Sequence, residues 1–308
     1  MTLKAFTNVF AGNPLNRASE KRGDETWLTE QLGSSESLAM AMWNGKPLVE
    51  DAKDGGAQLA YLPAKMAREL SGGPERLLFM GLWQDTAVFA VDLDGAGDPV
   101  DGPLEGLGRF EDLRAIATTM PAGDAGIAAT ARSMFEWRRR HRHCAACGEA
   151  SVVAEAGWKR VCPACKAQHF PRTDPVVIML AVRGDSCLMG RGSHFPPKMY
   201  SALAGFLEPG ESIEEACARE LFEEAGLRAT RVRYHSTQPW PYPSSLMIGL
   251  IAEVAEGEAV PDNVEIDEVR WFTREETRRL LAGGVQNAFA PGPLAIAHQL
   301  IRAWAEEG

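Results

Sequence analysis

Residues 205–227 read GFLEPGESIEEACARELFEEAGL, and this stretch decides the fold of the second half of the chain. Ser212 followed by Glu215 is the pattern of a capping box, which predicts that a helix begins after Ser212. Gly226 suits the left-handed position beyond a helix end, so the helix should stop there. The residues before Ser212 include glycine and proline, and the sequence therefore predicts a loop followed by a capped helix.

Glutamates gather on one side of this predicted helix. At about 100° per residue, Glu220, Glu223 and Glu224 fall within an arc of roughly 100°, beside an apolar arc that can pack on a core. Like charges three and four residues apart destabilise a helix by roughly 0.2–0.5 kcal/mol per pair. Divalent cations such as Mg²⁺ or Mn²⁺ prefer oxygen ligands and would offset this repulsion. From the spacing alone, an acidic face exposed to solvent is an equal alternative.

The longer pattern resembles the Nudix box at every defined position: Gly205-x5-Glu211-x7-Arg219-Glu220-Leu221-x-Glu223-Glu224-x-Gly226-Leu227. In that family the loop–helix–loop binds divalent metals at a diphosphate linked to a second moiety. The resemblance implies that Glu220 and Glu224 are metal ligands and that Glu223 is a ligand or the catalytic base. It also implies that Arg219 orients the glutamates by ion pairing, and that Gly205 lets the backbone approach metal and phosphate.

Elements around the box complete the expected domain. PVVIMLAV (175–182) predicts a buried strand, Gly184-Asp185 a turn, and residues 186–190 a second strand. Further strands are expected at 229–237, 246–254 and 268–272, and helices at about 273–282 and 294–305. The resemblance implies an α+β protein in which the Nudix domain is an α/β/α sandwich with a mixed sheet.

Two cysteine pairs, Cys144-x2-Cys147 and Cys162-x2-Cys165, are separated by 14 residues. Four thiolates at this spacing can surround Zn²⁺ tetrahedrally and leave no position for water, so the predicted zinc is structural. Redox-active pairs and a lost metal site are the alternatives. The remaining cysteines lie on an apolar strand and an apolar helix face, and we expect them to be buried.

Residues 1 to about 135 carry no motif that points to chemistry. Asn44-Gly45 suits a tight type I′ turn and predicts a hairpin. A helix is expected to begin at Asp124, its predicted N-cap. Its end, RRRHRH (138–143), is interpreted first as cations at a helix C-terminus, and alternatively as a contact for a phosphate-bearing ligand or RNA. Two more strands are predicted at 77–83 and 86–93.

Downstream of the box, the chain resembles the Ser-Gln-Pro-Trp-Pro-Phe-Pro-x-Ser signature of NADH pyrophosphatases: Thr237-Gln238-Pro239-Trp240-Pro241-Tyr242-Pro243-Ser244-Ser245. The resemblance implies that Gln238 to Ser245 bind substrate, with Trp240 and Tyr242 lining a nucleobase pocket. A proline-rich loop is preorganised and loses little entropy on binding. Thr237 and Tyr242 depart from the signature, and the Tyr242 hydroxyl could alter the preference between dinucleotides. A rigid structural loop is the alternative.

Further matches to this family are single residues. The resemblance implies an additional metal ligand at Glu265, with Glu268 as its competitor because the register slips easily there. Ala204 resembles a position whose backbone carbonyl binds metal. The substrate contacts that the resemblance implies are Phe170 and Phe206 near the nicotinamide, the backbone of Ala295, and the upstream Arg114.

The order of segments also resembles the NADH pyrophosphatase family: an N-terminal α+β domain over 1–135, a zinc ribbon over 140–171 and a Nudix domain over 172–308. This resemblance implies metal-dependent hydrolysis of NADH or NAD⁺ to a nicotinamide mononucleotide and AMP. The alternatives are the NAD cap of RNA as substrate, another dinucleotide such as ADP-ribose, and an inactive module that only binds. We also expect a homodimer with one structural zinc per chain.

Composition excludes some classes of protein. The 308 residues include 32 Lys and Arg against 42 Asp and Glu, a formal net charge of −10, which argues against a general nucleic-acid binder. A local basic patch is compatible with this charge. No stretch approaches the ~20 apolar residues of a membrane span, and the N-terminus lacks the pattern of a signal peptide. We therefore expect a cytoplasmic protein that works without a membrane.

Overall fold

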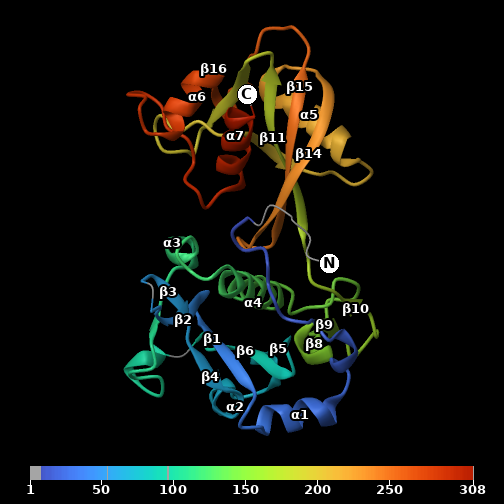
Figure 1. The fold of residues 1–308 in the computed structure, drawn as a ribbon. Helices are drawn as coiled ribbons and strands as arrows, with labels where there is room; N and C mark the ends of the chain where they lie inside the picture. The colour runs from blue at the N-terminus through green and yellow to red at the C-terminus, as the bar shows by residue number, and fades with distance from the viewer. Residues whose placement is uncertain (1–7, 54, 96, 308) are drawn as a thin grey trace. The chain divides into compact units, whose positions relative to one another are not determined.

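The structure is a computed structural model, and it describes residues 8–53, 55–95 and 97–307. The described chain divides into two compact units (Figure 1). The N-terminal unit contains residues 10–172 together with 240–244, and the C-terminal unit contains residues 8–9, 173–239 and 245–307. The segment 240–244 therefore belongs by its contacts to the N-terminal unit, although the strands on either side of it belong to the sheet of the other unit.

A seven-stranded sheet forms the centre of the N-terminal unit. Its strands are β1 (Leu38–Trp43), β2 (Lys46–Asp51), β3 (Ala57–Leu59), β4 (Tyr61–Pro63), β5 (Leu77–Trp83), β6 (Thr86–Asp92) and β7 (Arg109–Phe110). Their order is β3-β2-β1-β6-β5, with β4 paired to β1 and β7 paired to β2. Asn44 and Gly45 both have positive φ between β1 and β2, which confirms the predicted hairpin.

Helices of the N-terminal unit are α1 (Glu25–Gly33), α2 (Ala64–Ser71), α3 (Leu113–Ile116) and α4 (Ala122–Arg140). The long helix α4 is confirmed, but the prediction that Asp124 is its N-cap is wrong. The helix begins two residues earlier, after Pro121, whose fixed φ of −52° leads into it. The Asp124 carboxylate instead accepts the backbone N–H of Leu59 on β3 at 2.9 Å, a partner that the local sequence does not reveal.

The cysteine-rich segment forms its own small sheet within the N-terminal unit. Its strands are β8 (Val152–Ala154), β9 (Lys159–Val161) and β10 (Gln168–His169), in the order β10-β9-β8. All neighbouring pairs are antiparallel. Each cysteine pair lies in a turn next to this sheet, so a short stretch of chain holds both pairs close together.

A six-stranded sheet forms the centre of the C-terminal unit. Its strands are β11 (Asp174–Arg183), β12 (Ser186–Gly192), β13 (Leu203–Phe206), β14 (Ala229–Trp240), β15 (Ser245–Val254) and β16 (Ile266–Thr273). Their order is β14-β15-β11-β12-β16, with β13 paired to β11. The central strand β11 runs parallel to β15 and antiparallel to β12 and β13, so the predicted mixed sheet is confirmed.

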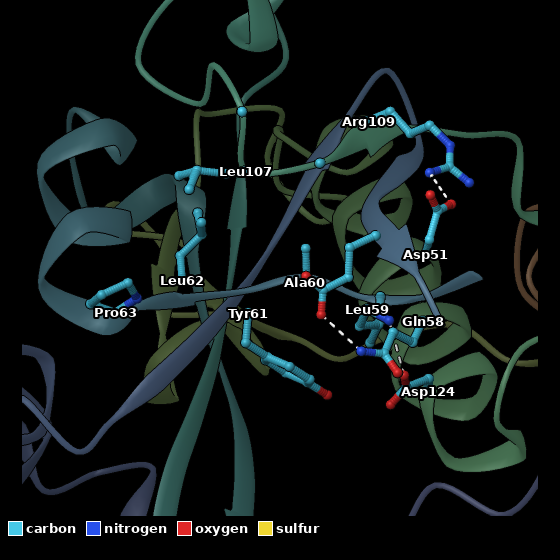
Figure 2. Close-up of a pocket in the computed structure, with 13 residues that line it drawn as sticks. Asp51, Gln58, Leu59, Ala60, Tyr61, Leu62, Pro63, Leu107, Arg109 and Asp124 are labelled. Atoms are coloured by element: carbon cyan, nitrogen blue, oxygen red, sulfur yellow. Dashed lines mark hydrogen bonds and ion pairs between the residues drawn. The ribbon is translucent and has the colours of Figure 1, made fainter. Parts of the chain in front are cut away.

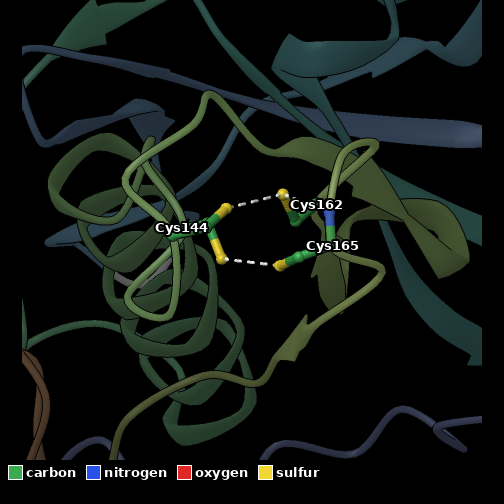
Figure 3. A group of neighbouring side chains, drawn as sticks. Cys144, Cys162 and Cys165 are labelled. Atoms are coloured by element: carbon green, nitrogen blue, oxygen red, sulfur yellow. Dashed lines mark hydrogen bonds between the residues drawn. The ribbon is translucent and has the colours of Figure 1, made fainter.

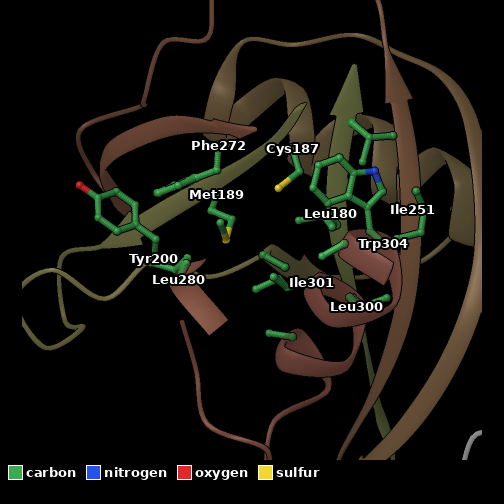
Figure 4. Close-up of a cluster of buried hydrophobic side chains, with 14 of the residues drawn as sticks. Leu180, Cys187, Met189, Tyr200, Ile251, Phe272, Leu280, Leu300, Ile301 and Trp304 are labelled. Carbon is green, nitrogen blue, oxygen red and sulfur yellow. The ribbon is translucent and has the colours of Figure 1, made fainter. Parts of the chain in front are cut away.

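Alternate residues of β11 point to opposite faces of the sheet, as the period of a strand requires. Val177, Met179 and Ala181 join a core with helix α5 (Ile213–Ala225). Their neighbours Ile178, Leu180 and Val182 join a second core with α6 (Arg274–Leu281) and α7 (Ile296–Glu306), which Figure 4 shows in part. The predicted α/β/α sandwich is thereby confirmed. Cys187 and Cys217 are buried in these two cores, as expected.

Candidate active site

Helix α5 begins and ends where the sequence predicts. Ser212 Oγ accepts the backbone N–H of Glu215 at 3.2 Å, and a Glu215 carboxylate oxygen accepts the Ser212 N–H at 2.8 Å, which completes the capping box. Gly226 follows the last helical residue with a φ of 68°. Leu221 and Ala225 are buried against the sheet. Because both ends and one face are fixed, the glutamates of α5 lie at defined positions.

Gly205 on β13 lies directly against the carboxylate of Glu220. A Cβ atom at this position would lie 1.8 Å from Glu220 Cδ and 2.0 Å from Glu220 Oε1. Any side chain here would therefore displace the carboxylate, and only glycine permits the close approach of the strand. The close contact explains why the predicted loop needs glycine at its first position.

Arg219 links the loop before α5 to the helix. Its guanidinium donates to both carboxylate oxygens of Glu211, at 2.6 and 2.8 Å, and to the Phe206 carbonyl at 2.9 Å. It also donates to Glu220 at 2.8 Å and to Glu223 at 2.9 Å. These ion pairs hold the pKa of Glu211 well below its usual range, at about 2. Arg219 therefore orients several carboxylates at once, as the resemblance implies.

Glu224 is the most buried acid of the cluster, with 5% of its surface exposed. Burial, followed by the charges of Glu220, Glu265 and Asp262, raises its pKa to about 8, although a hydrogen bond from the Ala204 backbone opposes the shift. One of its carboxylate oxygens, Oε2, has no hydrogen-bond partner among the described residues. A buried carboxylate without a partner, surrounded by other acids, suits a bound cation.

The structure places Glu265, and not Glu268, beside the α5 glutamates. Glu265 raises the pKa of both Glu220 and Glu224, which shows that its charge is close to theirs. Glu268 instead lies 3.5 Å from Arg191. Sequence reasoning missed Asp262, whose carboxylate accepts the backbone N–H groups of the three residues from 264 to 266 at 2.9–3.2 Å. This turn holds Glu265 in place, and its signal in the sequence is Pro-Asp-Asn at 261–263.

The glutamate cluster fits a divalent cation by its chemistry, although its oxygens are spread apart. Among the ranges that the structure describes, the four cysteines are the only group of three or more metal-ligating residues whose ligand atoms all lie within 4.8 Å of one another. Arg219 draws Glu220 toward its own guanidinium, which accounts for part of the spread. Hard oxygen donors of this kind prefer Mg²⁺ or Mn²⁺.

The four cysteines form the predicted zinc cluster (Figure 3). Cys144 Sγ lies 3.5 Å from Cys165 Sγ, and Cys147 Sγ lies 3.5 Å from Cys162 Sγ. Four thiolates around zinc at about 2.3 Å would be roughly 3.8 Å apart, so this spacing fits the ion. In each pair, the backbone N–H four residues after the first cysteine donates to that cysteine's carbonyl, so the two turns are built alike.

Gln238 is buried, with 1% of its surface exposed. Its amide nitrogen donates to the carbonyls of Val9 and Leu294 at 3.1 and 2.8 Å, and its amide oxygen accepts the Ile296 N–H at 2.9 Å. No hydrogen-bonding group of the amide is left to face a ligand. The structure therefore gives the Gln238 amide a structural role, in which it joins β14 to the start of α7. A substrate contact at Gln238 stays a prediction.

Aromatic rings of the segment 240–244 lie among arginines of the N-terminal unit. The Trp240 and Tyr242 rings are 5.4 Å apart, and Phe10 contacts both edge-on. The Arg114 guanidinium lies 3.8 Å from the centre of the Tyr242 ring and 5.8 Å from that of Trp240. Three of the sequence-predicted residues, Arg114, Trp240 and Tyr242, are thereby brought together by the fold.

Other predicted residues are positioned in different ways. Phe170 belongs to the N-terminal unit and Phe206 to the C-terminal unit, and their rings are 62% and 60% exposed. Ala295 is the N-cap of α7, where its carbonyl accepts the N–H of His298 at 3.0 Å. Ser245 begins β15 opposite Asp174 of β11. Ala204 lies on β13, and its backbone forms a hydrogen bond with the Glu224 carboxylate.

The arginine run at the end of α4 is only partly exposed. Arg138 is buried, and its guanidinium donates to the carbonyls of Leu77 and Glu75. Arg139 and Arg140 both pair with Glu136 on the same helix. Arg138 therefore supports the fold and does not extend a basic track for RNA, which was the alternative interpretation of this run.

A separate pocket of about 800 Å³ lies on the N-terminal unit (Figure 2). It is lined by strands β3 and β4 and the loop at 106–109, and Arg109 pairs with Asp51 at its rim at 2.7 Å. The pocket contains none of the sequence-predicted site residues.

Within the residues that the structure describes, no helix combines the length and the apolar character that a membrane crossing needs.

Comparison with known proteins divides the chain into three matched segments. Residues 36–137 match the NADH pyrophosphatase-like rudimentary NUDIX domain, residues 139–170 match the NADH pyrophosphatase zinc ribbon domain, and residues 171–290 match the NUDIX domain. The first match assigns a domain type to the part of the sequence in which we found no chemical motif.

Curated relatives extend over most of the chain. NAD-capped RNA hydrolase NUDT12 of Macaca fascicularis is 36% identical, and the match covers 96% of this chain and 73% of that protein. An NAD-capped RNA hydrolase of Schizosaccharomyces pombe is 32% identical, covering 98% and 93% of the two chains. The NAD-capped RNA hydrolase NudC of Chromobacterium violaceum is 37% identical, covering 73% and 78%.

Proposed function

Because this chain belongs to the NADH pyrophosphatase and NAD-capped RNA hydrolase family of Nudix hydrolases, we propose that it hydrolyses the pyrophosphate bond of NADH or NAD⁺ to a nicotinamide mononucleotide and AMP. A water oxygen forms a bond to one phosphorus, and the bond from that phosphorus to the bridging oxygen breaks. The same reaction on a capped RNA would release the nicotinamide mononucleotide and leave a 5′-monophosphate on the RNA.

The buried carboxylate of Glu224 is the observation that carries this proposal. Its unpartnered oxygen and its raised pKa support a cation site here, because a bound cation would offset the cost of the buried negative charge. Glu220 and Glu265 surround it and would complete the ligand set, together with the carbonyl of Ala204. An exposed acidic face, the alternative interpretation of the helix, would not bury one of its acids.

A divalent ion bound there, Mg²⁺ or Mn²⁺, supplies positive charge for the phosphoryl oxygens and lowers the pKa of water. The residues of this chain accept the proton and orient the carboxylates. Glu223 has a side chain that is 57% exposed, so it is accessible to accept a proton from the attacking water. Arg219 holds Glu220 and Glu223 at 2.8 and 2.9 Å and keeps both carboxylates oriented.

Substrate recognition is assigned to the aromatic segment after β14. Trp240 and Tyr242 present rings beside Arg114, an arrangement that suits a ligand carrying both an aromatic base and phosphates. We expect Trp240→Ala to raise the KM for NADH by about tenfold and leave kcat nearly unchanged, because the ring binds ground state and transition state alike. An unchanged KM would make this segment merely structural.

Product analysis tests the proposed substrates directly. The purified protein would be incubated with NADH, NAD⁺, NADPH, ADP-ribose and NAD-capped RNA in Mg²⁺ or Mn²⁺, and nucleotides would be separated by chromatography. We expect nicotinamide mononucleotide and AMP from NADH or NAD⁺, and product formation slower by on the order of 10²-fold in the Glu224→Gln variant. Cleavage of ADP-ribose without cleavage of NADH, NAD⁺ or capped RNA would overturn the assignment.

We further propose one Zn²⁺ per chain, supported by the spacing of the four thiols, and a homodimer, supported by the family resemblance alone. Metal analysis of protein purified without chelator should give one zinc per chain. Size-exclusion chromatography with light scattering should give twice the 33.5 kDa mass of the chain. A stable monomer at micromolar concentration would overturn the dimer.

A further inference from the structure

Within the N-terminal unit, Arg132 links helix α4 to the aromatic segment 240–244. It lies near the middle of α4, and its Nη1 donates to the Pro241 carbonyl. Its guanidinium carbon also lies 4.3 Å from the centre of the Tyr242 ring. One side chain therefore contacts two successive residues of the segment, the first by a charge-assisted hydrogen bond and the second over the face of its ring.

The other side of the Arg132 guanidinium is held by the β1–β2 hairpin. Its Nε donates to the Gly45 carbonyl at 3.2 Å, at the turn where both residues have positive φ. A Cβ atom at Gly45 would lie 3.5 Å from Arg132 Nη2, so the turn packs closely on the guanidinium. Because the planar guanidinium has donors in a fixed geometry, its position between two carbonyls is well defined.

Burial makes this contact costly to break. Burial lowers the pKa of Arg132, and the neighbouring Tyr242 and Glu136 partly oppose that effect. The carbonyls and the aromatic face take the place of the water that the guanidinium has lost. If Arg132 moved away from the segment, the Pro241 carbonyl would lose this hydrogen bond and the guanidinium would lose one of its two carbonyl partners, so the arrangement favours one conformation of the segment.

We propose that Arg132 is a positioning residue for substrate binding: it fixes Pro241 and Tyr242 of the substrate segment in the conformation that receives the dinucleotide. The inference rests on the proposed function. The N-terminal domain would then contribute to substrate binding, because its helix α4 holds the segment that lies in sequence between β14 and β15. Because Arg132 acts through its contacts with Pro241 and Tyr242, its effect should appear in KM.

The test compares Arg132→Met and Arg132→Lys with Arg140→Met. Arg140 is a matched control because it is an exposed arginine of the same helix that pairs only with Glu136 among the contacts described for its side chain. We expect Arg132→Met to raise the KM for NADH about tenfold with kcat within about twofold, and Arg132→Lys to raise it less. Lysine can donate to one carbonyl but cannot join two and stack on a ring.

Hydrogen exchange supplies a readout that does not depend on substrate. The Tyr242 N–H donates to the Trp240 carbonyl at 2.8 Å. We expect this amide to exchange about tenfold faster in Arg132→Met and at the wild-type rate in Arg140→Met. The lysine variant keeps the test valid if the methionine variant does not fold.

The two possible failures can be told apart. Wild-type turnover of NADH, combined with an unchanged KM and unchanged exchange at Tyr242 in both Arg132 variants, would overturn the positioning role alone. A lower melting temperature with wild-type KM would do the same, because it would make Arg132 a support of the fold. Absence of any turnover of NADH, NAD⁺ or capped RNA by the wild-type protein would overturn the proposed function and the role in substrate binding with it.

Discussion

Replacing Glu224 with glutamine should have opposite effects on stability and on activity. The substitution keeps the shape of the side chain and removes a charge that is buried among other acids. In buffer free of Mg²⁺ and Mn²⁺, we expect the variant to be more stable than the wild type at neutral pH. With metal added, we expect its kcat to fall by on the order of 10²-fold, because a charged ligand has been lost.

The sign and size of the stability effect follow from the pKa of Glu224, which rises from 4.5 to about 8 in the folded protein. The folded protein holds this proton more tightly than the unfolded chain does. The group therefore stabilises the fold fully below about pH 4.5 and loses that contribution as the pH rises toward 8. One pH unit corresponds to about 1.36 kcal/mol for a single titrating group. Between pH 5 and pH 7.5 the free energy of unfolding therefore falls by at most ~3 kcal/mol through Glu224.

Urea unfolding of wild type and Glu224→Gln at a series of pH values measures this difference. The buffer should contain no chelator, so that the cysteine cluster keeps its zinc. We expect equal free energies of unfolding near pH 5, and a variant that is more stable by up to ~3 kcal/mol near pH 7.5. Glu214→Gln is the matched control, since Glu214 is an exposed acid on the same helix. A difference that does not change with pH, or a fully active variant, would refute the reasoning.

Three further substitutions test other parts of the site. Cys162→Ser should lower the zinc content and the melting temperature, because the binding energy of the metal is partly folding energy. Elemental analysis would measure the zinc and calorimetry the melting temperature. Normal stability without zinc would contradict this prediction. Gln238→Ala should lower the free energy of unfolding by about 2–4 kcal/mol, since it removes a buried side chain that hydrogen-bonds to three backbone groups, and a raised KM with unchanged unfolding would refute it. Gly205→Ala should lower kcat by 10- to 100-fold by displacing Glu220, and wild-type kinetics would show that the strand can shift.

Features that depend on local interactions could be predicted from the order of the residues. The capping box of Ser212 and Glu215 joins residues three apart, and the stop at Gly226 depends on one backbone angle. The hairpin at Asn44-Gly45 depends on the same kind of local preference. The cysteine pairs needed only spacing to predict zinc. In each case the partners lie within a few residues or follow a fixed pattern, so the sequence specifies the geometry.

Partners that lie far apart in the chain become visible only in the folded protein. Gln238 and Trp240 are two residues apart in one signature. The Gln238 amide nevertheless hydrogen-bonds to the backbone of Val9, 229 residues away, and to the backbone at the start of α7, 58 residues away. Asp124 finds its partner 65 residues earlier, and Arg138 finds a carbonyl 61 residues earlier. Buried polar groups must be paired, and the fold supplies those partners from distant parts of the chain. A side chain's role therefore follows from long-range packing that no local pattern records.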